Sequence, residues 1–380
     1  MSGHRVLLTN ATMRDRTGAE LYVHDVALGL LARGHAPVVY SHVLGPLADR
    51  LRDATIPVVD NLQALVNPPD VIHAQGNLEG LIALLQFPGV PAVRVCHGWA
   101  DDAPVPFPRV LRYVAVDETT RDRLLGEWGV PAQQVQVLLN FVDLTRFHPR
   151  PPLPVRPRRA LVFSNYARAH VEWVRRACAR FEIEVDAVGS SVGAEIGAPE
   201  DLLGGYDLVF AKGRCAIEAL AVGSAVILCD ASGIGPLVST HNFADLRRLN
   251  FGLRALREPL GVEAICTEIA RYDAADAGEV SQRLRAVASA DVGIDRLVEV
   301  YERVMAEWRD HPRDATHSEQ QAVAAYLREL APRLSWNQSP RAILYAWVRR
   351  LYFGLQRVPL LRRLLPGRQA AQRWQERLRS

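Results

Sequence analysis

Residues 206–238 constrain the fold of this 380-residue chain more than any other stretch. The apolar run 208–211 is short enough for a buried parallel strand, and the Ala/Leu-rich run 215–222 predicts a helix that ends in glycine. A second apolar strand, 225–229, leads into a glycine-rich turn at 232–236. A strand that enters a helix through a glycine turn leaves backbone N–H groups free to bind an anion. The segment therefore predicts an α/β domain with an anion-binding site.

Charged side chains lie at the start of this predicted helix. Lys212 is the only lysine of the chain, since the other 44 of its 45 basic residues are arginine. A compact ammonium at the mouth of an anion-binding turn suggests that its charge is used there. Arg214 and Glu218 are four residues apart on one helix. Two interpretations remain, a simple ion pair beside a solvated lysine or part of a binding site.

The same segment resembles the donor-binding motif of the GT-B glycosyltransferases, specifically of the retaining family 4. The matching residues are Glu218, Ala219, Ala221, Gly223, Ala225, Val226 and 233–238. The resemblance implies that Glu218 binds the ribose of a nucleotide sugar, and that N–H groups around Gly213 and Gly233 hold its diphosphate. It also implies that Ile234 and Gly235 belong to the donor site.

The loops that would hold the diphosphate differ from the family pattern. Phe210 stands where the family has a second glutamate. After the first strand of the second half the family has an arginine and a lysine, whereas this chain has residues 164–168, SNYAR. We predict that Ser164 lies in the donor site and that Arg168 supplies one positive charge. Lys212 or Arg214 would supply the other, and both would stabilise the charge that develops on the leaving nucleotide.

The first 41 residues read as a β–loop–α–β unit of Rossmann type, with a strand at 5–10, a helix at 18–33 and a strand at 36–41. The unit lacks GxGxxG, so a nicotinamide dinucleotide site is not indicated. It resembles the opening of family 4, which implies that Gly18 approaches the donor phosphates. A glycine that only starts a helix is the alternative.

Polar side chains follow several predicted strands of the first half, where strands and helices alternate as in a parallel sheet. His73 and His97 are two of them. Residues 96–99 resemble a family segment whose histidine contacts the donor sugar, which implies that role for His97; a structural histidine is the alternative. Residues 114–149 also resemble the family and imply that Asn140 faces the cleft, with Phe141 in place of the usual glycine.

Five prolines among the eleven residues 149–159 predict the main domain boundary, because such a segment continues neither a helix nor a sheet. The predicted fold class is α/β, with two Rossmann-like domains that face a central cleft. The predicted divisions are an N-terminal domain, a linker, a nucleotide-sugar domain, helices returning to the first domain, and a tail: 1–150, 151–159, 160–297, 298–335 and 336–380. Residues 299–308 and 319–330 are the two candidates for the returning helix.

The tail differs in charge from the rest of the chain. Residues 341–380 hold ten arginines and one glutamate, which leaves 35 basic and 41 acidic residues elsewhere. Apolar and aromatic residues recur at helical spacing in its first half, so the tail predicts a basic amphipathic helix on an anionic membrane surface. A helix packed on the body of the protein with a solvated arginine face is the alternative.

Composition narrows the remaining classes. The net charge of +3 argues against a general nucleic-acid binder. The five cysteines are scattered and form no CxxC pair, which predicts a reduced, cytoplasmic protein without structural zinc. No apolar run reaches the length of a membrane span, and we expect neither a bound metal nor a cofactor.

The sequence therefore predicts a glycosyltransferase with His97, Lys212 and Arg214 as its catalytic residues. The resemblance implies transfer with retention from a nucleotide-sugar donor, and the tail suggests a lipid-linked or cell-envelope polysaccharide acceptor at the inner face of the membrane. A nucleotide-sugar 2-epimerase is an alternative, for which Asp101, Asp102 and Asp117 offer acid–base carboxylates. A non-catalytic binding protein of the same fold is the other.

Overall fold

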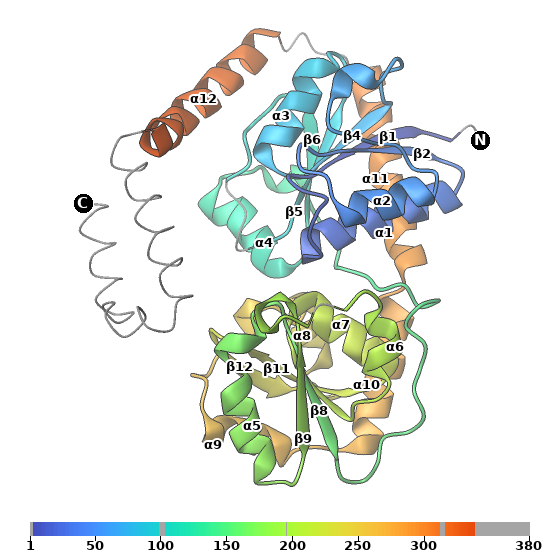
Figure 1. Cartoon of the computed structure of the whole chain (residues 1–380). Coiled ribbons are helices and arrows are strands. Elements are labelled where there is room, and N and C mark those ends of the chain that lie inside the picture. The colour runs from blue at the N-terminus through green and yellow to red at the C-terminus, as the bar shows by residue number, and fades with distance from the viewer. Residues whose placement is uncertain (1–2, 99–102, 195, 312–315, 339–380) are drawn as a thin grey trace, which may run out of the picture. The chain divides into compact units, whose positions relative to one another are not determined.

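Seven parallel strands form the first sheet, in the order β3-β2-β1-β4-β5-β6-β7 (Figure 1). The strands are β1 (Arg5–Thr9), β2 (Ala36–Tyr40), β3 (Val58–Val59), β4 (Val71–Ala74), β5 (Ala92–Cys96), β6 (Val110–Ala115) and β7 (Val135–Val137). Their helices are α1 (Gly18–Ala32), α2 (Pro46–Asp53), α3 (Asn77–Gln86) and α4 (Glu118–Asp122). The strand order reverses between β1 and β4, and such a reversal opens a crevice at the carboxyl ends of the strands.

The second sheet has the order β12-β11-β10-β8-β9. Its strands are β8 (Arg159–Phe163), β9 (Glu184–Val188), β10 (Leu208–Ala211), β11 (Ala225–Asp230) and β12 (Gly233–Leu237), of which only β12 runs antiparallel to its neighbour. Its helices are α5 (Val171–Ala179), α6 (Pro199–Leu203), α7 (Gly213–Val222), α8 (Phe243–Arg248), α9 (Val262–Ile269) and α10 (Ala274–Val287). The order reverses between β8 and β10. The two sheets confirm the predicted class of two Rossmann-like domains.

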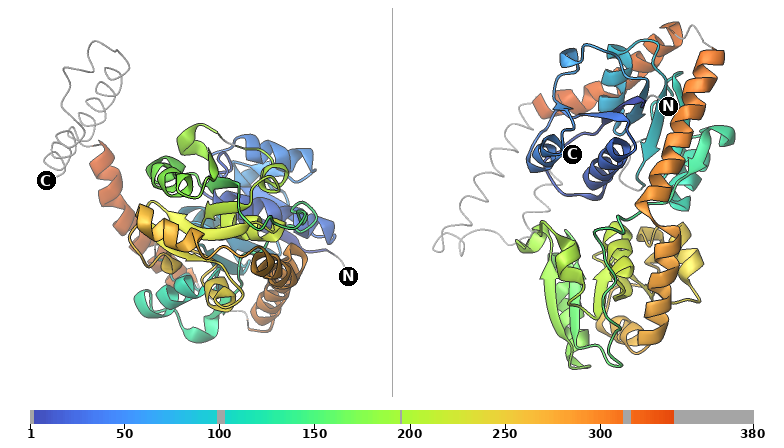
Figure 2. Two further views of the ribbon diagram at one scale, coloured as in Figure 1. Left: turned by 90° about the horizontal axis from the view of Figure 1, so that it is seen from below. Right: turned by 90° about the vertical axis from the view of Figure 1, so that its right-hand side faces the viewer.

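Helix α11 (Ala290–Asp310) follows the second sheet in the chain but packs on the first, as Figure 2 shows in orange. Ile294, Leu297 and Tyr301 belong to the core of the first sheet together with the strand residues. The helix contains residues 299–308, one of the two candidates for the returning helix. Its side chains already enter the core of the first sheet at Ile294. The hydrophobic core of the first sheet is therefore built from two distant parts of the chain, residues 6–141 and helix α11.

This computed structural model describes residues 3–98, 103–194, 196–311 and 316–338. Residues 1–313 form one compact unit and residues 314–380 another. The described part of the second unit is helix α12 (Thr316–Gln338), which contains the second candidate, 319–330. Of the predicted basic tail, 336–380, residues 339–380 lie outside the described residues.

Two sequence-based predictions about local structure are wrong. The glycine-rich turn expected at residues 232–236 is strand β12, where Ile234 exchanges backbone hydrogen bonds of 2.9 and 3.1 Å with Glu258. The sequence of residues 245–256 on its own also predicts a single helix, but α8 ends at Arg248. Asn250 and Phe251 follow with positive φ angles of 49° and 52°, which a helix does not contain.

Candidate functional site

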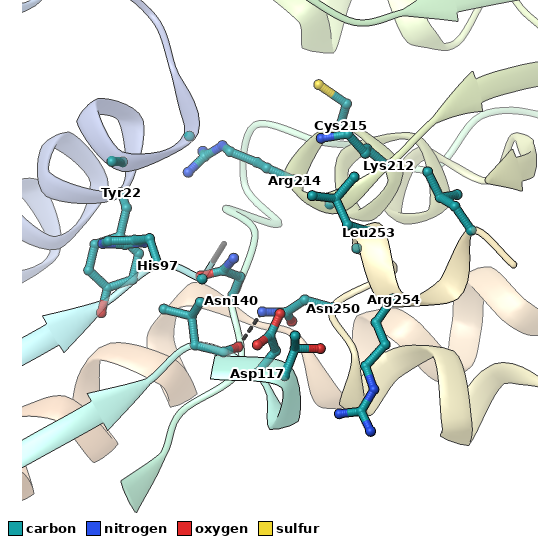
Figure 3. A pocket seen from close by; sticks show the side chains of 18 of the residues that line it. Tyr22, His97, Asp117, Asn140, Lys212, Arg214, Cys215, Asn250, Leu253 and Arg254 are labelled. Atoms are coloured by element: carbon teal, nitrogen blue, oxygen red, sulfur yellow. Dashed lines mark hydrogen bonds between the residues drawn. The ribbon is translucent and has the colours of Figure 1, made fainter. Parts of the chain in front are cut away.

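A cleft with a volume of about 960 Å³ lies where loops at the carboxyl ends of both sheets meet (Figure 3). Seven of the residues predicted from the sequence line it: Gly18, His97, Asn140, Ser164, Lys212, Gly213 and Arg214. Gly18 follows β1, whereas Ser164 and Lys212 follow β8 and β10, so these residues stand at the two points where strand order reverses. The topology brings together side chains that are far apart in the sequence.

His97 follows β5 and forms part of the first domain's wall. Its imidazole meets the ring of Tyr22 edge to face, with 4.8 Å between the ring centroids. Tyr22 lies on α1 and also packs on Phe141, at 5.6 Å between centroids. Figure 3 shows Tyr22 and His97 side by side in the wall. Aromatic contact from a buried ring therefore fixes the orientation of the histidine.

His73, the other strand-end histidine, is not part of the cleft. It is fully buried in β4, and its Nδ1 lies 2.5 Å from the hydroxyl oxygen of Tyr301 on α11. Burial, and then the nearby His97 and Arg94, lower the pKa of His73 to about 3. It is therefore a neutral side chain of the core.

Asn140 lies in the cleft after β7, next to the loop that follows α8. Its backbone oxygen accepts a 2.6 Å hydrogen bond from Arg247. Its side-chain Oδ1 is buried without a hydrogen-bond partner among the described residues. A buried acceptor of this kind is a position at which a ligand hydroxyl would bind favourably.

The second domain's wall is formed by the start of α7. Lys212 directly precedes the helix, and its Nζ lies 3.2 Å from Oδ2 of Asp230 at the end of β11. The N–H of Gly213 donates a 2.8 Å hydrogen bond to the carbonyl oxygen of Phe251. That N–H group is therefore occupied within the protein, which corrects its predicted role in holding the diphosphate.

Arg214 points from α7 towards α1 (Figure 3) and binds two carboxylates. Its Nε donates to Glu218 at 2.7 Å, and its Nη2 donates to Asp25 of α1 at 2.5 Å. Burial opposes the charge of Arg214, but these two carboxylates outweigh it and raise the pKa of the guanidinium. Arg214 is thus an ionic bridge between helices of the two domains.

The two carboxylates differ in how well their charge is compensated. Burial would raise the pKa of Asp25, but the charge of Arg214 and a hydrogen bond from His24 outweigh burial and lower it. Burial raises the pKa of Glu218, and Arg214 only partly offsets this effect. The charge of Arg214 therefore stabilises the anion of Asp25 more completely than that of Glu218.

Five predicted donor-site residues do not line the cleft: Arg168, Glu218, Gly233, Ile234 and Gly235. Arg168 lies in the short 3₁₀ turn Ala167–Ala169, where its N–H donates to Ser191 Oγ at 3.1 Å. The three residues of β12 contribute to a strand rather than to an anion-binding turn. Glu218 is buried beneath Arg214, in the ion pair that the sequence left open as the simpler interpretation.

The sequence interpretation missed the loop after α8, which forms one side of the cleft with Asn250, Gly252, Leu253, Arg254 and Leu256. The Asn250 side chain donates to the carbonyl oxygen of Val116, and Arg254 lies 2.5 Å from Asp122 Oδ2. Both contacts connect the second domain to the first. The sequence signal for this loop is Asn250 followed by Gly252. Asparagine and glycine disfavour a continued helix, and asparagine tolerates a positive φ.

Asp117 is the one epimerase carboxylate among the described residues, since Asp101 and Asp102 lie outside them. It lines the cleft, but its Oδ1 accepts hydrogen bonds of 2.7 Å from both the N–H and the hydroxyl of Thr120 and so caps α4. Burial raises the pKa of Asp117, and the Thr120 donors partly offset the rise.

No cluster of three or more His, Cys, Asp or Glu side chains suited to a metal ion occurs in the described part of the chain. Among the helices described, none combines the length and apolar character needed to cross a membrane.

Comparisons with known proteins agree with this architecture. Residues 16–146 match the family model of Glycosyltransferase Family 4. No curated protein matches the sequence. A glycosyltransferase from Rickettsia africae has a similar structure, with a TM-score of 0.59, 15% identity, and coverage of 80% of this chain and 99% of that one.

A second similar structure is Anabaena HepE in complex with UDP and glucose. Its TM-score is 0.56 at 15% identity, over 79% of this chain and 99% of that one. At such low identity the likeness establishes the fold. The chain thus has the GT-B glycosyltransferase fold, and its residues 16–146 resemble family 4.

Proposed function

We propose that this protein is a glycosyltransferase that transfers a sugar from a nucleotide-sugar donor. The observation that carries the proposal is the cleft, which stands at the strand-order reversals of two Rossmann-like domains and is lined by His97, Lys212 and Arg214. Its volume of about 960 Å³ suits a ligand of nucleotide-sugar size. The family-model match and the HepE complex with UDP and glucose support the same class.

In the proposed reaction the bond between the sugar and the diphosphate breaks, and negative charge develops on the leaving nucleotide. Lys212 stands at the start of α7, where the helix dipole also favours an anion. Fixed cations in a cleft shielded from water stabilise such charge strongly. His97, held by Tyr22, and Asn140, with its unpartnered Oδ1 among the described residues, would bind sugar hydroxyls.

Finer features extend the proposal. The resemblance to family 4 supports retention of configuration and catalysis without a bound metal. The excess of arginine in residues 341–380 supports a lipid-linked or cell-envelope polysaccharide acceptor at an anionic membrane surface on the cytoplasmic side. For the epimerase, Asp117 is a weak candidate base because it already caps α4.

The test is the release of nucleoside diphosphate from UDP-, GDP-, ADP- and dTDP-sugars by the wild type, measured by chromatography. We expect release from one donor class. Lys212→Ala should lose this release. The control Arg180→Ala, which removes an exposed ion pair with Glu263 at the C-terminal end of α5, should keep it. Interconversion of two UDP-sugars without an acceptor would favour the epimerase. If the wild type neither releases nucleoside diphosphate nor shows a thermal shift with any donor, the proposal is overturned in favour of a non-catalytic protein.

A further inference from the structure

We propose that Asp230 is a positioning residue for Lys212: it fixes the ammonium group in the wall of the cleft, so that an anionic ligand meets a charge that is already in place. The proposal rests on the proposed function for the identity of that anion, the diphosphate of a nucleotide sugar. It extends the function by giving a role to a buried carboxylate that does not itself line the cleft.

The carboxylate of Asp230 is held firmly at the end of β11. The residue pairs with Gly233 in the hairpin of β11 and β12, and its Oδ1 accepts a 3.2 Å hydrogen bond from the N–H of Ser232. Its side chain is 9% exposed. A closely packed side chain with one oxygen bonded to the backbone has few alternative positions. Asp230 is therefore a fixed point beside the start of α7.

Lys212 has a side chain that needs such a fixed point. A flexible four-carbon stem separates its backbone from the ammonium group, and holding such a stem in one conformation costs side-chain entropy. Its Nζ lies 3.2 Å from Oδ2 of Asp230, and its side chain is 26% exposed in the lining of the cleft (Figure 3). The ion pair orders the stem when the protein folds, so a ligand does not have to.

The ion pair leaves the ammonium group able to bind a ligand. An ammonium has three N–H donors, and within the described ranges Nζ makes no other hydrogen bond or ion pair than the one to Asp230. The N–H of Gly213 at the same helix start is already bonded to the carbonyl oxygen of Phe251. An anion at this point therefore depends on the side chain of Lys212 more than on the first backbone donor of α7.

Arg214, the other cation at the start of α7, is in a different electrostatic position. Its guanidinium binds the carboxylates of Glu218 and Asp25, whose side chains are 5% and 6% exposed. Two buried carboxylates compensate one arginine, whereas Lys212 faces a single carboxylate and reaches only one of its oxygens. A bound anion therefore gains more from Lys212 than from Arg214.

His170, the residue before α5, does not compensate Asp230 in place of the lysine. The imidazole is fully buried. Burial lowers the pKa of His170, and the charge of Asp230 opposes this effect only in part. The imidazole is thus neutral at pH 7. In the described part of the chain, Lys212 is the cation that pairs with Asp230, so the two side chains hold each other in place.

The first test observes Lys212 directly. It is the only lysine of the chain, so protein grown with ¹³C-lysine carries one labelled side chain, whose ε-CH₂ signals are followed by NMR. In the wild type we expect two inequivalent ε protons, as in a fixed side chain. In Asp230→Asn, whose amide oxygen can still accept from Ser232, the signals should narrow and merge. Glu263→Gln, which removes an exposed ion pair of the same domain, is the control and should match the wild type.

The second test is the binding of inorganic pyrophosphate, the probe for a diphosphate, measured from the same signals. Loss of a negative charge would by itself strengthen anion binding, whereas loss of position weakens it, so the sign of the change separates the two effects. We expect the dissociation constant to rise about threefold in Asp230→Asn. Asp230→Ser, which also removes the charge, should give the same result and replaces Asp230→Asn if that variant does not fold.

The third test is turnover of the donor that the wild type uses. Asp230→Asn should lower kcat about tenfold, because a misplaced charge stabilises the leaving group less. In a Lys212→Ala background the same change should lower kcat no further, since Asp230 acts through the lysine. A merely structural role of Asp230 would lower kcat equally in both backgrounds.

Tighter pyrophosphate binding by Asp230→Asn would show that Asp230 competes with the anion for Lys212, and the proposal would be overturned. Unchanged NMR signals of Lys212, or an equal loss of kcat with and without the lysine, would overturn it as well. A wild type that releases no nucleotide from any donor refutes the proposed function alone, because the NMR signals and the pyrophosphate titration still decide whether Asp230 positions Lys212.

Discussion

The ring of Tyr22 is inclined by 74° to the imidazole of His97, with 4.8 Å between their centroids. Tyr22 is buried on α1 and packs on Phe141, so the histidine rests on a side chain that cannot easily move. This contact links the hydrophobic core of the first domain, to which Tyr22 belongs, to the cleft. The order of His97 therefore depends on the core behind it.

We expect Tyr22→Leu to lower kcat about tenfold, because a flexible aliphatic chain leaves the imidazole free to rotate away from its working geometry. Tyr22→Phe keeps the ring and serves as the matched control, with kcat close to wild type. Steady-state kinetics with the donor at saturation would measure both. Equal loss in the two variants would show that the hydroxyl, and not the ring, matters.

Lys212→Ala should lower kcat by about 100-fold, the usual effect of removing one group that stabilises developing negative charge. Lys212→Arg keeps a positive charge but spreads it over a larger planar group beside Asp230, so we expect only partial recovery. Single-turnover rates would separate this effect from donor binding. An alanine variant as active as wild type would remove Lys212 from the reaction.

His73 should make the protein less stable in acid. Its folded pKa is lowered to about 3 by burial, whereas an unfolded histidine titrates near 6.5. Between these values only the unfolded chain binds the proton, so stability is lost as the pH falls, by about 2 kcal/mol at pH 5. We expect His73→Gln to lose that much less stability than wild type between pH 7.5 and pH 5 in urea unfolding.

The control for this prediction is His241→Gln, at an exposed position. It should follow the pH dependence of the wild type. A His73→Gln protein with the wild-type dependence would show that another group binds the proton.

Asn250 combines a positive φ with a hydrogen bond to the first domain, and two substitutions separate these effects. Asn250→Ala should destabilise the protein through both the lost bond and the left-handed backbone. Asn250→Gly loses only the side-chain hydrogen bonds, the one to Val116 and the one from Arg247, and we expect it to be about 1 kcal/mol more stable than the alanine variant. Chemical unfolding measures the difference, and a more stable alanine variant would contradict it.

Phe141 occupies the position at which the resembling family has glycine, and a glycine of α11 makes room for it. A Cβ atom at Gly293 would lie 2.4 Å from Cδ1 of Phe141. We expect Gly293→Ala to destabilise the protein by roughly 1–3 kcal/mol, as overpacking does. Phe141→Ala combined with Gly293→Ala should recover part of this loss relative to the sum of the single changes, in a double-mutant cycle.

The buried strands were predictable because parallel strands covered on both faces read as continuous apolar runs, as residues 208–211 do. The error at residues 232–236 has a physical cause. A Cβ at Gly235 would lie 2.5 Å from the carbonyl oxygen of Ala255, and one at Gly233 would lie 2.7 Å from that of Glu258. These glycines permit close backbone approach in a strand, which composition alone does not distinguish from a turn.

Site residues that directly follow strands were predictable from the sequence. Contacts between side chains far apart in the sequence were not. His97, Ser164 and Lys212 follow strands and reach the cleft for that reason. The Arg214–Glu218 pair is visible from its spacing of four residues. Asp25 is not, because nothing local marks a carboxylate that meets a guanidinium 189 residues later.

The return of α11 to the first sheet has a consequence for synthesis on the ribosome. Residues 159–287 contain all strands and packing helices of the second domain, so this domain can complete its core as soon as they emerge. The first domain still lacks Leu297, Tyr301 and Val304 at that stage. We therefore expect the domain that is made first to finish folding last. Limited proteolysis of nascent chains arrested so that the residues up to 290, but not α11, have left the ribosome should find the second domain protected and the first still open to cleavage.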